Sequence, residues 1–246
     1  MTDIKKYPLG RKLSPFDSRD YNLRHFIPQE AFEEEPITAR KWDFPSESLN
    51  QGDFPHCVGF SGASWGINSP INTVFANDDG HKMYYECKVV EGEPNEENGA
   101  YVRSIAKVLK SRGRLDVYAF APDIATIRWW LLNKGPVITG TIWTQSMFTP
   151  DENNIITIDA NVVGGHAYLL NEWREDGYIG IQNSWGKEWG DNGKAYIHFL
   201  DFEKLFKYGG EAMAGVELPT PIPNQETKKH WLLELILDFF KSLFRL

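Results

Sequence analysis

Cysteine is scarce in this chain of 246 residues, which contains only Cys57 and Cys87. Two thiols can form one bridge at most, so the disulfide framework of a small secreted domain is excluded. The sequence also lacks any run of about 18 apolar residues, the length that a membrane-spanning helix needs. Residues 1–11 carry lysine and arginine and have no apolar core, unlike a signal peptide. These absences predict a reducing, cytoplasmic location.

Runs of lysine and arginine are missing as well, and the formal net charge is −8. A chain of this charge is poorly suited to nucleic acid, so we expect no nucleic-acid partner. Hydrophobic residues make up 41% and charged residues 24% of the sequence, values typical of globular proteins. The chain is long enough for one large domain or two small ones with a substantial core.

The secondary-structure pattern changes along the chain from helical to extended. Helical spacing and flanking helix breakers predict helices at 57–65, 81–90, 100–111 and 123–132. Residues of high β-propensity then predict strands at 136–143, 155–158, 167–171, 178–182 and 194–199. Helices followed by strands predict an α+β fold in which a domain at 41–217 has two lobes with a cleft between them. The helical lobe is expected at about 41–120 and the antiparallel β lobe at about 121–217.

The first 40 residues are polar and irregular. They contain Pro8, Pro15 and Pro28, and the acidic run Glu33–Glu35 stands before Pro36. This composition predicts an extended arm that lies on the surface of the protein and is not a folded inhibitory unit.

The C-terminal residues differ from both predicted lobes. Three prolines predict a stiff linker at 218–228. At 229–246 the spacing predicts an amphipathic helix whose charged residues share one face: Glu234, Asp238, Lys241 and Arg245. The remainder of Trp231–Leu246 is mostly large and apolar, so this helix must cover a wide face. The alternatives are packing on the protein's own domain and binding to a membrane surface or a protein partner.

Three separated residues suggest nucleophilic catalysis by a thiol. Cys57 follows a Gly/Pro turn at the start of a predicted helix, where free N–H groups favour a thiolate. His166 follows two glycines and stands directly before a predicted strand, and Asn183 follows the next strand. A thiol nucleophile needs a base and a group that orients the base, and these residues offer both. Taken alone, Cys57 fits a small buried core residue better than it fits a nucleophile.

The motifs around these residues resemble those of papain-like (cathepsin-like) cysteine peptidases of peptidase family C1. The family sequence Gln-Gly-x-Cys-Gly-Ser-Cys-Trp-Ala-Phe-Ser is matched in part by Gln51–Ser61, and Gly-His-Ala by Gly165–Ala167. The motif Asn-Ser-Trp-Gly-x-x-Trp-Gly-x-x-Gly is intact at Asn183–Gly193. The resemblance covers about Trp42 to Val216. The short segment Asp17–Tyr21 is similar to the arms of bacterial and phage relatives that lack a long propeptide.

The resemblance implies a two-lobe papain-like fold with a β-barrel-like second lobe, and a thiol protease that hydrolyses polypeptides through an acyl-enzyme. Cys57 would be the nucleophile, His166 the general acid and base, and Asn183 the residue that orients the imidazole. Gln51 and the Cys57 N–H would form the oxyanion hole. No cofactor and no metal ion are expected.

The resemblance also implies residues that bind the polypeptide substrate. Trp185 would cover the hydrogen bond between Asn183 and His166, and Gly165 would lie beside the substrate. Gly99 and Ala100 would form the edge of the cleft that pairs with the substrate main chain. Ala100 replaces a glycine there, so its methyl group is expected to narrow the cleft.

Departures from the family surround the nucleophile. Phe54 replaces a cysteine, and the cysteine that would pair with it is missing before Asn98, so this disulfide is lost as a unit. Pro55-His56 and Val58 replace the family's Gly-Ser and Trp. His56 is a second histidine near the thiol, but adjacent side chains diverge, so His166 is the better base. These departures leave two alternatives open, a peptide-binding scaffold with little or no activity and a transpeptidase that uses the same acyl-enzyme.

Overall fold

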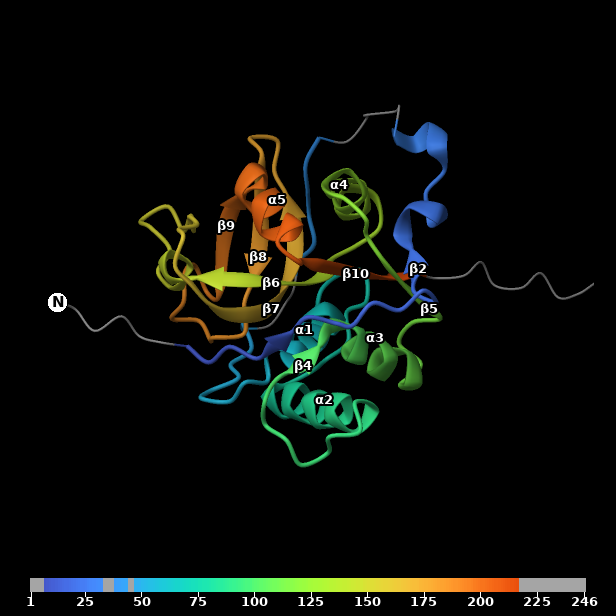
Figure 1. Cartoon of the computed structure of the whole chain (residues 1–246). Coiled ribbons are helices and arrows are strands. Elements are labelled where there is room, and N and C mark those ends of the chain that lie inside the picture. The colour runs from blue at the N-terminus through green and yellow to red at the C-terminus, as the bar shows by residue number, and fades with distance from the viewer. Residues whose placement is uncertain (1–6, 33–37, 44–46, 217–246) are drawn as a thin grey trace, which may run out of the picture. The chain divides into compact units, whose positions relative to one another are not determined.

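One large, mostly antiparallel sheet runs through the centre of the fold (Figure 1). Its strand order is β2-β5-β10-β6-β7-β8-β9, and β3 pairs with β7 outside this path. The strands are β2 (Tyr21–Asn22), β3 (Arg40–Lys41), β5 (Val117–Phe120), β6 (Val137–Thr144), β7 (Val162–Trp173), β8 (Tyr178–Gln182), β9 (Lys194–His198) and β10 (Glu211–Val216). The sheet is open, with β2 and β9 at its ends, and is not closed into a barrel.

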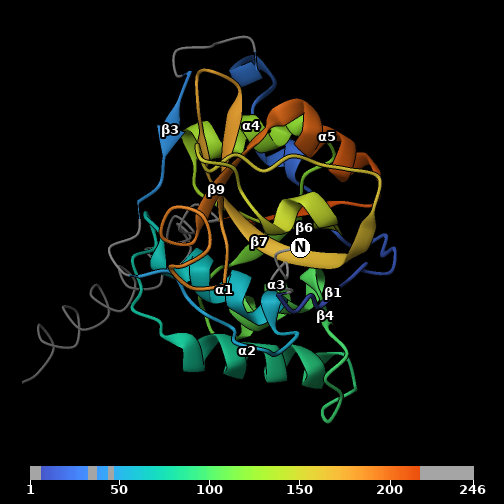
Figure 2. The ribbon, with the colours of Figure 1, turned by 90° about the vertical axis from the view of Figure 1, so that its left-hand side faces the viewer.

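The sheet separates two hydrophobic cores because successive side chains of a strand point to opposite faces. In β7, Ala167 and Leu169 join one core, whereas Tyr168 and Leu170 join the other. Helices α1 (Cys57–Ile67), α2 (Asn77–Val90) and α3 (Val102–Ser111) cover the first face (Figure 2). Helices α4 (Ile124–Asn133) and α5 (Phe199–Lys207) cover the second. This arrangement is the expected α+β fold, and the face covered by α1, α2 and α3 is called the helical side.

Helix α1 lies at the centre of the first core, and all of its residues are buried. Its glycines, which have low helix propensity, let neighbouring elements approach closely. A Cβ at Gly59 would overlap the backbone of Gly80 in α2, and one at Gly62 would overlap the side chain of Ile105 in α3. The expected buried helix is therefore confirmed, and its glycines are explained by helix packing.

Most predicted elements are present with bounds shifted by a few residues, but some predictions fail. Residues 155–158 form no strand, since Ile155 makes only an isolated bridge to Tyr196. The pattern did not indicate β5, α5 or β10. Strand β10 consists mainly of small residues, and it is formed by pairing with both β5 and β6. Long-range pairing overrides its low β-propensity.

The N-terminal arm does not simply lie on the surface as expected. Its strand β1 (Arg11–Lys12) pairs in parallel with β4 (Ala100–Tyr101), beside α3 (Figure 2). Two 3₁₀ helices follow, at Leu23–Phe26 and Gln29–Phe32. Leu23 is completely buried in the second core. The arm is thus an integral part of the fold, because its apolar and main-chain groups find partners far along the chain.

The structure is a computed structural model that describes residues 7–32, 38–43 and 47–216, all within one compact unit that ends at Val216. The predicted linker at 218–228, the predicted amphipathic helix at 229–246 and the acidic run at Glu33–Glu35 lie outside the described residues. In the described ranges, no helix combines the length and apolar character required to cross a membrane.

Candidate active site

Cys57 is the first residue of α1 and is completely buried. The first N–H groups of a helix have no partner within the helix, so the sulfur lies where a negative charge would be stabilised. Burial has the larger effect and raises the pKa of the Cys57 thiol to about 11, although nearby backbone N–H groups of Ala167, Gly10 and Val58 oppose it. In the conformation described, Cys57 is therefore a neutral thiol at pH 7.

His166 and Asn183 are brought together as expected. His166 lies on β7 and Asn183 directly follows β8, its antiparallel neighbour. Their Nε2 and Oδ1 atoms are 2.8 Å apart, and the N–H of Ser184 donates to the same Oδ1 at 2.8 Å. Because this oxygen can only accept, His166 must carry its proton on Nε2. Its Nδ1 is left as a buried lone pair with no hydrogen-bond partner among the described residues.

Aromatic rings surround the imidazole of His166. The Trp185 ring stacks on it with ring centroids 4.5 Å apart, and Trp143 meets it edge-on at 4.9 Å. Burial lowers the pKa of His166 to about 4, against the weaker raising effect of its hydrogen bond to Asn183. Trp185 thus excludes water from the His166–Asn183 pair, and the imidazole is neutral at pH 7.

Gln51 presents its side-chain amide to the same region. Its Oε1 accepts a 2.7 Å hydrogen bond from the hydroxyl of Ser184, which fixes the orientation of the amide. Its Nε2 donates to the carbonyl oxygen of Phe54 at 2.7 Å and lies 3.3 Å from that of Pro8. A carbonyl oxygen of the arm thus occupies the place next to the predicted oxyanion-hole donor. Ser184 is a positioning residue that sequence reasoning missed, although it belongs to the Asn183–Gly193 motif.

Residues 7–12 of the arm cover the candidate site. Tyr7 stacks on Trp185 with ring centroids 4.5 Å apart and ring planes 7° from parallel. Gly10 lies beside the Cys57 thiol, and a Cβ at Gly10 would overlap the carbonyl oxygen of Pro55. The burial that keeps Cys57 and His166 neutral therefore includes this segment. Sequence reasoning missed the contact, because nothing in the composition of the arm indicates where it packs.

The remaining predicted substrate-binding residues also contact the arm. Ala100 donates its N–H to the carbonyl oxygen of Gly10 at 2.8 Å. Gly99 has a φ of +86°, and a Cβ there would overlap the same oxygen, so a glycine is required at this position. A Cβ at Gly165 would overlap the carbonyl oxygen of Arg11. The arm thus runs along the edge where the resemblance places a polypeptide substrate.

His56 directly precedes Cys57, and Cys87 is the second thiol of the chain. Both are held by contacts that do not involve His166. Nδ1 of His56 lies 2.8 Å from Nδ1 of His81, and its ring stacks on Tyr84 with centroids 3.7 Å apart. Burial, followed by the neighbouring His81, lowers the pKa of His56 to about 4. Cys87 is a free, completely buried thiol whose pKa is raised by burial. Neither residue is arranged as a nucleophile–base pair.

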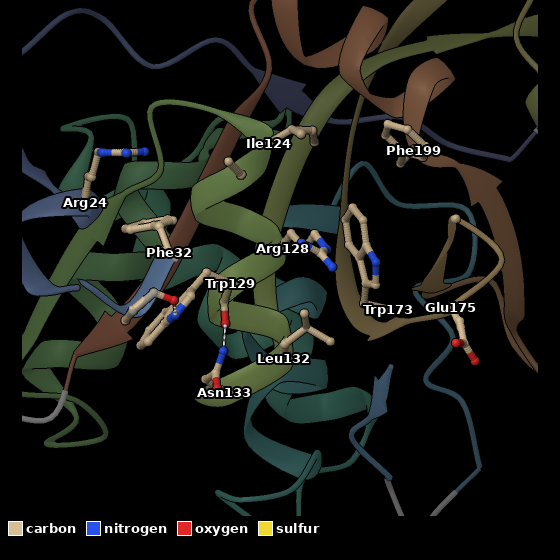
Figure 3. A pocket seen from close by; sticks show the side chains of 13 residues that line it. Arg24, Phe32, Ile124, Arg128, Trp129, Leu132, Asn133, Trp173, Glu175 and Phe199 are labelled. Atoms are coloured by element: carbon tan, nitrogen blue, oxygen red, sulfur yellow. Dashed lines mark hydrogen bonds between the residues drawn. The ribbon is translucent and has the colours of Figure 1, made fainter. Parts of the chain in front are cut away.

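A separate hollow of about 620 Å³ lies at α4 (Figure 3), and Cys57 is not among the residues that line it. Aromatic and basic side chains line it, among them Trp129, Trp173 and Arg128. The lining includes no cysteine, serine or histidine, so the hollow has no candidate nucleophile or imidazole base. Within the described parts of the chain, no group of three or more histidine, cysteine, aspartate or glutamate side chains is arranged to hold a metal ion.

Solved structures that share this arrangement of helices and strands include proteins named as cysteine proteases. Xylellain from Xylella fastidiosa is 17% identical with a TM-score of 0.71, and the match covers 87% of this chain and 98% of that one. Procathepsin B S9 from Trypanosoma congolense is 12% identical with a TM-score of 0.63, and the match covers 87% of both chains. The proform of Amb a 11 from ragweed pollen is 14% identical with a TM-score of 0.58, covering 82% of this chain and 76% of that one.

Comparison of the sequence with models of protein families found no match, and comparison with curated proteins found none either. Identities of 12–17% establish the fold alone. The fold of this chain is that of the papain-like cysteine proteases.

Proposed function

We propose that the protein is a cysteine peptidase in which Cys57, His166 and Asn183 carry the reaction. The main support is the hydrogen bond from His166 Nε2 to Asn183 Oδ1, which leaves Nδ1 free as a base. Further support comes from the position of Cys57 at the N-terminus of α1 and from the papain-like fold. Asn183 is neutral, so it orients the ring and holds its tautomer without competing for the proton.

In the proposed reaction, the Cys57 sulfur attacks the carbonyl carbon of a peptide bond while His166 Nδ1 takes the thiol proton. His166 returns this proton to the leaving nitrogen as the carbon–nitrogen bond breaks, and a thioester remains on Cys57. Water then attacks the thioester carbon and gives a proton to His166. The sulfur leaves, recovers the proton, and the acid product is released.

Gln51 and the backbone N–H of Cys57 are proposed to stabilise the negative oxygen that forms during both attacks. The hydroxyl of Ser184 supports this role of Gln51 because it holds the amide in one orientation. A donor that is already in place stabilises the transition state without reorganisation, and one such donor is typically worth about 3 kcal/mol.

The conformation described here is proposed to be a resting state. Residues 7–12 cover Cys57 and His166, so this segment has to move before a polypeptide can bind. Departure of the arm admits water and removes the burial that keeps the thiol and the imidazole neutral. This part of the proposal is supported by the contacts of Tyr7 with Trp185 and of Gly10 with Ala100.

A peptidyl epoxide, which alkylates an active-site thiol, tests the proposed pair of Cys57 and His166 directly. We expect it to alkylate Cys57 of the full chain, with the site identified by peptide mass mapping, and to react far more slowly with His166→Ala. Cys87→Ala is the matched control and should react like the wild type, since Cys87 is buried in the core of the helical side. Labelling that is unaffected by His166→Ala would refute the proposed pair.

Product masses separate the alternatives that share this fold. Hydrolysis of a peptide adds one water across the broken bond, whereas transfer of the acyl group to an amine gives a new amide without added water. Peptide binding without either product would favour a scaffold that has lost activity.

A further inference from the structure

The main chain of the arm follows the residues that the resemblance assigns to substrate binding. Gly10 accepts from the Ala100 N–H at 2.8 Å, and Arg11 lies opposite Ala100 in the pairing of β1 with β4. The carbonyl of Pro8 lies 3.3 Å from Nε2 of Gln51. These contacts use main-chain atoms, which every polypeptide has. The path of the arm is therefore open to another extended polypeptide once the arm has left.

The side chain of Arg11 is buried in an acidic site. Only 4% of it is exposed, and its Nη2 lies 2.6 Å from both Glu211 Oε2 and the carbonyl oxygen of Gly209. Glycine makes room for it, because a Cβ at Gly140 would come within 2.9 Å of the Arg11 Nε. A long cationic side chain thus lies over the paired residues Gly140 of β6 and Glu211 of β10 and ends on a carboxylate that is itself largely buried.

The next residue, Lys12, reaches a second acidic site. Its Nζ lies 3.0 Å from carboxylate oxygens of both Glu91 and Glu93 and 4.5 Å from the centroid of the Tyr101 ring. Burial alone would lower the pKa of Lys12, but hydrogen bonds to the two glutamates raise it above its ordinary value. Two carboxylates and one aromatic ring thus bind the Lys12 ammonium, and together they form a cation-binding site.

The second site keeps a negative charge after Lys12 leaves. Lys88 is completely buried and contacts Glu91 at 3.1 Å and Glu93 at 2.6 Å. Its Nζ also donates to the carbonyl oxygen of Gly99 at 3.1 Å. One ammonium thus faces two carboxylates, and the lysine of the arm supplies the missing positive charge. Without a second cation, the carboxylate of Glu91, whose side chain is only 3% exposed, would be poorly compensated.

Consecutive side chains of an extended chain point to opposite sides, whichever way the chain runs. Arg11 and Lys12 therefore reach two different acidic sites from adjacent positions. The two basic residues of the arm pair with the two residues of β4, Ala100 and Tyr101, and fill both sites in the resting state.

From this we infer that the protein selects polypeptides with two consecutive basic residues, one bound by Glu211 and the other by Glu91 and Glu93. The inference rests on the proposed peptidase function and names its substrate class. According to this inference, Arg11 and Lys12 of the arm occupy the two acidic sites that would bind the basic residues of a substrate.

The test uses the full chain carrying Arg11→Gln and Lys12→Gln, named the arm variant, in which the arm no longer fills the two sites with cations. Internally quenched decapeptides carry an Arg-Lys pair, a single basic residue or an Ala-Ala pair, moved one position at a time. We expect the best Arg-Lys peptide to have a kcat/KM at least about tenfold above its Ala-Ala counterpart, as for charge-assisted hydrogen bonds. Equal kcat/KM values at all positions would overturn the inference and leave the peptidase function standing.

Replacing one glutamate at a time by glutamine shows which of the two basic residues each acidic site binds. In the arm variant, Glu211→Gln should reduce the preference for a basic residue at one position about tenfold, and Glu93→Gln should do so at the neighbouring position. Glu203→Gln is the matched control, because this glutamate pairs with Lys207 on the exposed face of α5. It should leave the preference unchanged. Loss of the preference in the control as well would overturn the assignment.

A binding measurement separates the inference from the proposed function. The arm variant with Cys57→Ala cannot form an acyl-enzyme, so fluorescence polarisation of a labelled peptide reports affinity alone. Binding of the Arg-Lys peptide at least about tenfold tighter than the Ala-Ala peptide supports the sites even if no peptide is hydrolysed. Equal affinities overturn them, whatever the activity of Cys57.

Discussion

Gly10 of the arm and Ala100 of the expected substrate-binding edge are joined by a 2.8 Å hydrogen bond from the Ala100 N–H to the Gly10 carbonyl oxygen. Gly10 also packs so closely on Pro55 that a Cβ would overlap the Pro55 carbonyl oxygen. The residue that pairs with the edge is thus wedged against the turn that precedes Cys57. The arm fits over the site only because glycine stands at this position.

A Gly10→Ala substitution should therefore loosen the arm without changing any residue of the candidate site. Overlap of this kind typically costs 1–3 kcal/mol, so we expect the rate of Cys57 alkylation to rise about tenfold or more. Alkylation is followed by mass spectrometry of the intact chain. Gly135→Ala is the control, since its Cβ would meet only Pro70 at an ordinary 3.5 Å. An unchanged rate in Gly10→Ala would show that the arm does not limit access.

Acid should favour release of the arm. Burial lowers the pKa of His166 to about 4 in the covered state, and exposure should return it toward its ordinary value of 6.5. Because the open state then binds a proton that the covered state does not, the covered state is most stable above pH 6.5 and loses stability as the pH falls toward 4. We expect hydrogen exchange of residues 7–12, corrected for intrinsic rates, to become faster over this range.

Two other imidazoles could produce a similar pH response. The pKa values of His56 and His81 are also lowered, in both cases chiefly by burial. The exchange measurement is therefore repeated in His56→Gln/His81→Asn. The acceleration should persist in this variant, and its disappearance would assign the response to this pair in place of His166.

Gln51→Ala should lower kcat in the arm variant. Removal of one preorganised oxyanion donor costs about a hundredfold or more in kcat, and the arm variant minimises any effect of Gln51 on arm binding. Ser184→Ala removes only the hydroxyl that holds Gln51 Oε1, so its kcat should fall by a smaller factor. Steady-state kinetics on one quenched peptide compares the two. A kcat that Gln51→Ala leaves unchanged would exclude Gln51 from the oxyanion hole.

Lys88→Met should destabilise the protein strongly. The ammonium is completely buried between Glu91 and Glu93, and its loss leaves the buried carboxylate of Glu91 with one of its two cations removed. Breaking a buried pair in this way typically costs 3–5 kcal/mol in the free energy of unfolding, as measured by denaturant titration. Lys204→Met breaks the exposed pair with Asp201 and should cost less than about 1 kcal/mol. Equal effects would contradict a structural role for the buried cluster.

Local patterns in the sequence were sufficient to indicate much of the fold and of the candidate site. The start of α1 at Cys57 follows from a turn next to small and apolar residues, and the strand at 167–171 lies within β7. Motif spacing also indicated that His166 and Asn183 lie together, which their 2.8 Å contact confirms. Their catalytic roles, with those of Cys57 and Gln51, stay predictions.

Contacts between distant parts of the chain decided the rest. Arg11 meets Gly209 and Glu211, about 200 residues away, and no local pattern in the arm indicates such a contact. The sequence by itself determined where helices, strands and motif residues stand, because propensity and spacing act over a few residues. Only the tertiary structure decided that the arm covers Cys57 and places two basic side chains in acidic sites. The physical reason is that burial and charge pairing depend on which distant groups the folded chain brings together.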